Sequence, residues 1–226
     1  MKVVLLHAFP LDERMWEPQV TALGDAKVEA PRLYGLGRTV EEWATALAGR
    51  LDEPAVLVGS SMGGYAALAV ARQAPERVLG VLLAGSRPDP DTDERRRERA
   101  RTIELIQKDG AEGLWESLRP RLLSDDAPDG VVERARTLAV DQKPEELVAA
   151  VEAMRDRPDA TDVANALGDR LLVAVGNRDP FVPGREAHSF GEGAAVAQFE
   201  GAGHLLSLER PDHFTHVVRD FAARWR

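Results

Sequence analysis

The chain has no cysteine among its 226 residues. Without cysteine it can form no disulfide, no thiolate metal site and no cysteine nucleophile. A cysteine-free sequence suits a reducing compartment, so we expect a cytoplasmic protein. The first apolar run spans only residues 3–6, whereas a signal peptide needs about 7 to 15 apolar residues. We therefore expect this run to be a buried strand and not a targeting segment.

Basic residues are outnumbered by acidic ones, and long apolar runs are lacking. Lys and Arg number 29 against 38 Asp and Glu, which gives a formal net charge of -9 at pH 7. Such a protein is repelled by nucleic-acid phosphates and by anionic lipid surfaces, so we expect neither nucleic acid nor a membrane as a partner. No stretch approaches the roughly 18 apolar residues that a membrane-spanning helix needs. The sequence predicts a soluble protein.

Hydrophobic residues make up 44% of the chain. Along the chain, short continuous apolar runs alternate with segments in which apolar residues have helical spacing. Short runs rich in Val and Leu are typical of strands buried on both faces of a parallel sheet. These runs lie at 3–6, 55–58, 78–84 and 171–175, with weaker ones at 27–30 and 195–199. Helical spacing covers 41–51 and 62–73 between them. The order predicts an α/β fold with a mostly parallel sheet and right-handed crossovers.

The alternation stops between residues 86 and 168, where apolar residues recur at the three- and four-residue spacing of amphipathic helices. We predict a helical lid over 86–168, inserted into one core made of 1–85 and 169–226. The lid starts with a charge run, DTDERRRERAR, at 91–101. Such a run can be an anion site but is far more often the solvated face of a helix, and we interpret it as the latter.

A candidate nucleophile follows the strand at 55–58. The segment Gly59-Ser60-Ser61-Met62-Gly63 fits the pattern G-x-S-x-G between a strand and a helix. The pattern needs glycine two positions on either side of the serine because the serine sits on a tight, strained turn between neighbouring backbones. The motif therefore indicates Ser61 as the nucleophile, and Ser60 stands at the wrong position for this geometry.

A serine hydroxyl is a weak nucleophile at neutral pH, so Ser61 requires a histidine base and an acid behind it. Asp179 follows the last strong strand, where functional groups of open α/β sheets collect. Asp89, in the loop after the strand at 78–84, is a rival because some related hydrolases place the acid there. We favour Asp179.

His204 is the predicted base among the five histidines. It lies in the turn GAGH after a weak strand and before the C-terminal helix. The remaining histidines are interpreted as surface or packing residues, and His7, at the end of the first strand, as structural. The resulting chain order, Ser61, Asp179, His204, is that of the α/β-hydrolases.

Acyl transfer also needs an oxyanion hole, which is formed by backbone N–H groups in enzymes with this motif. The first is the N–H of Met62, which follows the nucleophile. The second is expected from the loop after the first strand, and Phe9 occupies that position. We expect the Phe9 ring to form one wall of the acyl pocket.

Several motifs together resemble α/β-hydrolase-fold esterases and lactonases similar to 3-oxoadipate enol-lactonase. The resemblance covers nearly the whole chain and rests on LLHAFPLDERMW, APRLYGLGRT, VGSSMGGYAALA, EAMRDRPDAT, GNRDPFVP and GAGHLLSLERP. It implies hydrolysis of a small-molecule carboxylic ester or lactone through Ser61, Asp179 and His204, with Phe9 and Met62 at the oxyanion hole. No nicotinamide, flavin or metal motif is evident in the sequence, so we expect no cofactor or metal.

The chain departs from this group in three places. Ala8 stands where relatives usually have glycine, and Arg32 where they commonly have an acidic residue, although neither change removes a backbone N–H. The strand pair that usually precedes the first strand is missing, so we expect a sheet of about six strands.

The motifs leave the reaction and the substrate open. A carbon–carbon bond hydrolase or an acyltransferase would use the same triad, and a non-catalytic ligand-binding protein could share the fold. We name Phe9, Trp115, Met154 and Arg157 as candidate pocket residues. The sequence gives no indication of the oligomeric state.

Overall fold

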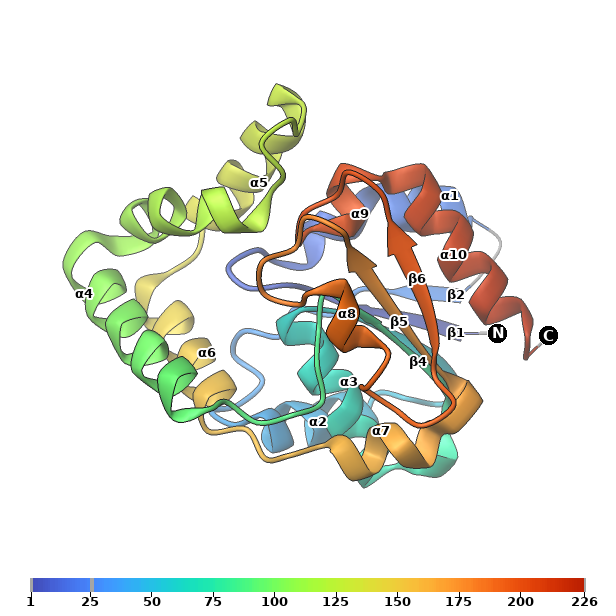
Figure 1. Cartoon of the computed structure of the whole chain (residues 1–226). Helices are drawn as coiled ribbons and strands as arrows, with labels where there is room; N and C mark the ends of the chain where they lie inside the picture. The colour runs from blue at the N-terminus through green and yellow to red at the C-terminus, as the bar shows by residue number, and fades with distance from the viewer. Residues whose placement is uncertain (1, 25–26, 226) are drawn as a thin grey trace.

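The computed structural model describes residues 2–24 and 27–225. Six strands form a single sheet in the order β2-β1-β3-β4-β5-β6 (Figure 1). Each strand is parallel to its neighbours. The strands are β1 (Lys2–Leu6), β2 (Lys27–Glu29), β3 (Ala55–Ser60), β4 (Val78–Ala84), β5 (Leu171–Gly176) and β6 (Ala195–Phe199). The predicted α/β fold with a parallel sheet of about six strands is confirmed.

The strength of each strand pattern in the sequence reflects the strand's place in the sheet. The four strong apolar runs are the central strands β1, β3, β4 and β5, which are buried on both faces. The weaker runs are the edge strands β2 and β6, which keep exposed residues. Alternate residues of β1 enter two separate cores, Val4 and Leu6 on one face and Val3 and Leu5 on the other, as the two-residue period of a strand requires.

Helices cover both faces of the sheet (Figure 1). Apolar side chains of α2 (Val40–Ala48), α3 (Met62–Gln73) and α7 (Thr161–Leu167) fill the core on one face. Those of α1 (Glu17–Leu23), α9 (Leu206–Glu209) and α10 (Pro211–Ala223) fill the other. The short elements are η1 (Glu13–Trp16), η2 (Pro75–Arg77), η3 (Gly168–Arg170) and α8 (Gly184–Ala187). The helix predicted at 62–73 has these bounds, and the one predicted at 41–51 spans 40–48.

Three further helices stand beside the carboxyl ends of the strands (Figure 1): α4 (Asp93–Leu122), α5 (Asp129–Val140) and α6 (Pro144–Arg155). The Thr92 hydroxyl caps the start of α4 by accepting the N–H of Arg95 at 3.3 Å. Inside α4, Gly110 has φ 67° and ψ -162°, which breaks the helix into two arms. A positive φ of this kind is accessible mainly to glycine. The two arms pack against α6 and α5 and so curve around the open edge of the sheet.

No helix in the described part of the chain is long and apolar enough to cross a membrane.

Candidate active site

Ser61 lies at the turn between β3 and α3, at the carboxyl edge of the sheet. Its backbone has φ 49° and ψ -111°, and it is the one residue other than glycine with a positive φ in the described ranges. Non-glycine residues rarely adopt this region, and such strain concentrates at functional sites. The turn is held by two hydrogen bonds: Ser61 N–H donates to Ala84 O at 2.8 Å, and the Ser86 hydroxyl donates to Ser61 O at 2.8 Å.

The two glycines of the serine motif allow the backbones around this turn to approach closely. A Cβ at Gly59 would collide with the backbone of Gly63 and Gly64, and a Cβ at Gly63 with the carbonyl oxygen of Leu6. The obstacles are backbone atoms, which cannot rotate away as a side chain can. Glycine at both positions therefore lets α3 start against β1 and β3, and this fixes the direction of Ser61.

Asp179 and His204 are in direct contact. Asp179 Oδ2 lies 2.8 Å from His204 Nδ1, and the exposed fraction of each residue is 5% or less. The other carboxylate oxygen, Oδ1, accepts the N–H groups of Phe181 at 2.8 Å and Val182 at 3.2 Å. These bonds fix the rotation of the carboxylate, which in turn orients the imidazole.

His204 is packed from two further sides. The Phe181 ring centre is 4.7 Å from the imidazole centre. A Cβ at Gly85 would come within 2.9 Å of His204 Nδ1, so the absence of a side chain there leaves room for the ring.

The loop that carries His204 is anchored to the end of α4. The N–H groups of His204 and Leu205 both donate to Leu122 O, at 3.1 and 3.2 Å. The buried Glu209 carboxylate adds a second link. It accepts Gly203 N–H through Oε1 at 3.0 Å, and Ser124 N–H and Ser124 Oγ–H through Oε2 at 3.0 and 2.5 Å. Glu209 therefore holds the residue before His204 against the inserted helices.

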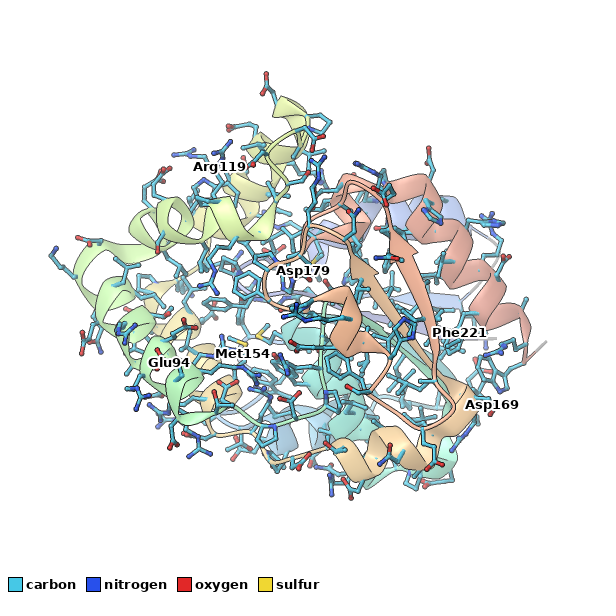
Figure 2. The ribbon with its side chains drawn as sticks, viewed as in Figure 1. Glu94, Arg119, Met154, Asp169, Asp179 and Phe221 are labelled. Atoms are coloured by element: carbon cyan, nitrogen blue, oxygen red, sulfur yellow. The ribbon has the colours of Figure 1, made fainter. Side chains whose placement is uncertain are left out.

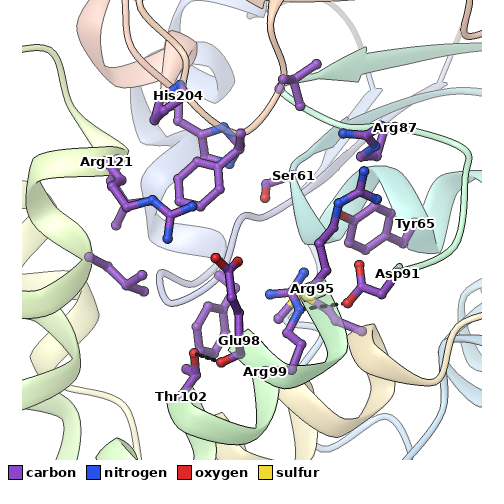
Figure 3. Close-up of a pocket in the computed structure, with 18 residues that line it drawn as sticks. Ser61, Tyr65, Arg87, Asp91, Arg95, Glu98, Arg99, Thr102, Arg121 and His204 are labelled. Carbon is purple, nitrogen blue, oxygen red and sulfur yellow. Dashed lines mark hydrogen bonds and ion pairs between the residues drawn. The ribbon is translucent and has the colours of Figure 1, made fainter. Parts of the chain in front are cut away.

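Ser61 and His204 open into one cavity of about 200 Å³ (Figure 3). Its apolar wall includes Phe9, Leu118, Met154, Phe181 and Val182. The rest of the wall is strongly charged and comes largely from α4. The cavity is thus lined both by residues at the carboxyl edge of the sheet and by residues of the inserted helices.

Two of the four candidate pocket residues line this cavity and two do not. Phe9 and Met154 are in its wall. Trp115 is 1% exposed and lies in the core on the α10 face of the sheet, where its side chain packs away from the cavity. Arg157 is buried behind the wall, where it stacks on the Tyr65 ring at 4.0 Å and pairs with Asp91 at 2.7 Å.

We interpreted the charge run at 91–101 as the solvated face of a helix, and the structure corrects this interpretation for part of the run. Asp91, Arg95, Glu98 and Arg99 line the cavity. Residues of the same helix on its other sides, such as Glu94 and Arg97, are exposed and pair with each other at 2.9 Å. Only part of the run is therefore a solvated helix face, because residues three and four apart in a helix share one side.

Asp89, the rival acid, is engaged with arginines. Its carboxylate accepts Arg87 Nε–H at 2.6 Å and Arg95 Nη1–H at 2.9 Å. Burial opposes its ionisation, but the two arginines outweigh this effect and hold the pKa of Asp89 below its usual value. The acid in contact with His204 is Asp179.

His7 has the surroundings of a structural residue. Its Nε2 accepts Leu33 N–H at 2.9 Å, and its Nδ1 lies 3.2 Å from Ala8 O. Burial lowers the pKa of His7 to about 4, so the ring is neutral at pH 7. These bonds join the loop after β1, which carries Phe9, to the segment after β2.

Of the two predicted oxyanion donors, Met62 follows Ser61 in the chain and Phe9 lines the same cavity as Ser61. Met62 begins α3, and the first N–H groups of a helix have no acceptor within it. Phe9 lines the cavity from the loop after β1. The oxyanion role of both N–H groups stays a prediction.

Among the described residues, no group of three or more His, Cys, Asp or Glu side chains is placed to hold a metal ion.

Comparison with known proteins agrees with this architecture. The family model described as the alpha/beta hydrolase family matches residues 3–215. The chain belongs to the alpha/beta hydrolase family. The predicted resemblance to esterases and lactonases of this fold is confirmed.

Individual relatives of this hydrolase include enzymes of known structure. A thermophilic esterase from Thermogutta terrifontis, solved with malate bound, is 33% identical; the match covers 99% of this chain and 90% of that one, with a TM-score of 0.92. The enol-lactonase from Burkholderia xenovorans LB400 is 25% identical, over 97% and 90% of the two chains, with a TM-score of 0.86. A pimeloyl-[acyl-carrier protein] methyl ester esterase from Neisseria meningitidis serogroup C is 26% identical over 97% of this chain and 93% of its own.

Sequence reasoning missed Glu209 in this hydrolase. Its only signal was a carboxylate inside the apolar segment LLSLERP, at a position where the helix is buried. A buried carboxylate requires hydrogen-bond donors, but the sequence could not reveal that Ser124, 85 positions away, supplies them.

We expect Glu209→Gln to lower both stability and turnover. The amide offers one acceptor oxygen, so a buried N–H of Gly203 or Ser124 loses its partner, at a cost of about 1 to 3 kcal/mol. The loosened loop should reduce kcat by up to about 100-fold through misplacement of His204, with little change in KM. Thermal unfolding and steady-state kinetics measure the two effects.

The matched control is Glu200→Gln, which changes an exposed carboxylate after β6. A Glu209→Gln variant with the stability and kcat of this control would show that the carboxylate does not position the histidine loop.

Proposed function

We propose that this protein is a serine hydrolase that cleaves small carboxylic esters or lactones through an acyl-enzyme. The observation that carries the proposal is the Asp179–His204 hydrogen bond of 2.8 Å beside a cavity that also holds Ser61. The relatives named as esterases and as an enol-lactonase support an ester or lactone as the substrate class.

In the proposed first half-reaction, Ser61 Oγ attacks the carbonyl carbon while His204 Nε2 takes the hydroxyl proton. Asp179 holds Nδ1–H of the imidazole and stabilises the imidazolium that forms. The negative charge on the carbonyl oxygen is received by the N–H groups of Met62 and Phe9. When the tetrahedral intermediate collapses, His204 returns the proton to the leaving alkoxide, and the acyl group stays on Ser61.

In the second half-reaction, water replaces the alcohol. His204 takes a proton from the water, whose oxygen attacks the acyl carbon, and the same oxyanion donors are used again. The acid is released as the proton returns to Ser61. A lactone follows the same steps, except that its alcohol remains attached to the acyl group.

We further propose that residues 86–168 form a lid over a core of 1–85 and 169–226. Cavity-lining residues from both α4 and α6 support this division. Within the segment, α7 packs in the core beside α3, so α4 to α6 are the part that shapes the pocket. Cytoplasmic location is proposed from the cysteine-free sequence alone.

The first test is Ser61→Ala, measured by hydrolysis of short p-nitrophenyl esters. Because the hydroxyl is the atom acylated, kcat should fall by a factor on the order of 10⁶, while thermal unfolding stays close to that of the wild type. The control is Ser60→Ala at the neighbouring position in β3, which should retain most of the activity. Near-normal turnover by a folded Ser61→Ala variant would sink the assignment.

The second test compares two carboxylates. Asp179→Asn should lower kcat by a factor on the order of 10⁴, because the amide holds the wrong tautomer of His204. Asp89→Asn removes a carboxylate that contacts only arginines in the described structure and should change kcat little. If the two results were reversed, the acid would have to be assigned to the loop after β4.

A further inference from the structure

The charged side of the cavity comes mainly from one helix. The first arm of α4 contributes Arg95, Glu98, Arg99 and Thr102, whose spacing places them on one side of the helix. The second arm, beyond Gly110, contributes Arg121 (Figure 3). With Arg87 added, four arginines and two carboxylates line the cavity. Positive charge is thus concentrated here in a chain whose formal net charge is -9.

Three of these arginines already have carboxylate partners. Arg87 and Arg95 share Asp89, at 2.6 and 2.9 Å. Arg99 pairs with Asp91 at 3.0 Å, and Asp91 is held from behind by the buried Arg157. Their charge is therefore largely compensated within the protein.

Arg121 differs from the other three. Within residues 2–24 and 27–225, no carboxylate lies within the 4.0 Å of an ion pair with its guanidinium. Its Cζ atom lies 4.2 Å from the centre of the Phe181 ring. Stacking of this kind holds the guanidinium by its face and leaves its N–H edge free. That edge matches the two oxygens of a carboxylate.

The Phe181 ring connects Arg121 to the site of the reaction. Its other neighbour is the imidazole of His204, at 4.7 Å between ring centres. The Phe181 N–H is bound by Asp179, so the platform under Arg121 is fixed to the same residue as His204. A ligand at the guanidinium edge would lie in the same cavity as Ser61 and His204, with the Phe181 ring in contact with both the guanidinium and the imidazole.

Glu98 faces this position from the opposite arm. Figure 3 shows the Glu98 carboxylate and the Arg121 guanidinium directed into the same space. Glu98 would repel a negative group bound at Arg121. It would repel a group with two negative charges more strongly than a group with one. The single free guanidinium therefore suits a carboxylate better than a phosphate dianion.

We propose that Arg121 selects substrates that carry a carboxylate remote from the ester or lactone bond. The inference rests on the proposed hydrolase function. Arg121 binds the remote carboxylate equally in the ground state and in the transition state, because no bond to that group changes. Its loss should consequently raise KM and leave kcat nearly unchanged.

The experiment compares two esters of equal chain length, monomethyl adipate, which is anionic, and methyl hexanoate, which is neutral. Arg121→Met should lower kcat/KM for monomethyl adipate about tenfold, the effect of one lost charge-assisted hydrogen bond. The same variant should change kcat/KM for methyl hexanoate by less than about twofold. Glu98→Gln should raise kcat/KM for the anionic ester several-fold, and added salt should reduce the preference of the wild type. Monomethyl succinate, glutarate and pimelate extend the comparison to other spacings.

Arg119→Met is the matched control. Arg119 lies two positions from Arg121, about 200° around the helix, and Figure 2 shows it on the outer side of α4. This change should affect neither ester. Thermal unfolding verifies that each variant is folded, and Glu98→Gln keeps the proposal testable if Arg121→Met is not.

Failure of the inference and failure of the proposed function give different results. If the wild type hydrolyses the neutral ester and Arg121→Met alters both esters equally, or alters neither, Arg121 does not select a carboxylate. The same conclusion follows if the wild type prefers neutral esters and Glu98→Gln does not change this preference. If the folded wild type hydrolyses no ester or lactone at all, the proposed function itself is wrong.

Discussion

The hydrogen bond between Asp179 and His204 depends on how a parallel sheet ends. Parallel strands bring their carboxyl ends to one edge, so the loops after β3, β5 and β6 meet although they are far apart in the chain. Ser61 arrives there on a turn that only closely packed glycines permit. Asp179 arrives with one oxygen occupied by backbone N–H groups, which leaves the other for the imidazole. The same edge is where the cavity opens.

The inserted helices do more than cover this edge. The carbonyl of Leu122, at the end of α4, accepts the N–H of His204, and Glu209 ties the preceding residue to Ser124. Arg121 is the residue before Leu122 and faces the cavity. One short stretch of chain therefore both supports the histidine loop and presents the charge that we propose selects the substrate. Changes in this stretch that alter specificity are expected to disturb the histidine as well, unless they are confined to side chains such as Arg121.

Most of the fold could be predicted from the sequence because its signals are local. The buried central strands read as apolar runs, and the turn at Ser61 as two glycines at fixed spacing. Asp179 and Asp89 both follow strong apolar runs, so position alone left two candidate acids, and it is the contact with His204 that distinguishes Asp179. It was harder to predict which residues of the inserted helices face the cavity and which face the core. An amphipathic pattern shows that a helix packs on one side, but it does not show what that side contacts. Trp115 was thus assigned to the pocket although it fills the core, and Arg157 although it supports the wall from behind. The cavity-facing half of the charge run and the role of Glu209 depend on partners far away in the sequence.

The most direct test of this account is to identify which residue of the wild-type protein reacts covalently. The protein is treated with a fluorophosphonate, digested, and the modified peptide is sequenced by mass spectrometry. The account predicts one adduct, on Ser61, because among the described residues Ser61 is the serine that lines the cavity with a histidine whose other nitrogen is held by a carboxylate. An adduct on Ser60 or on any other serine, or full ester turnover by protein in which Ser61 stays unmodified, would contradict it.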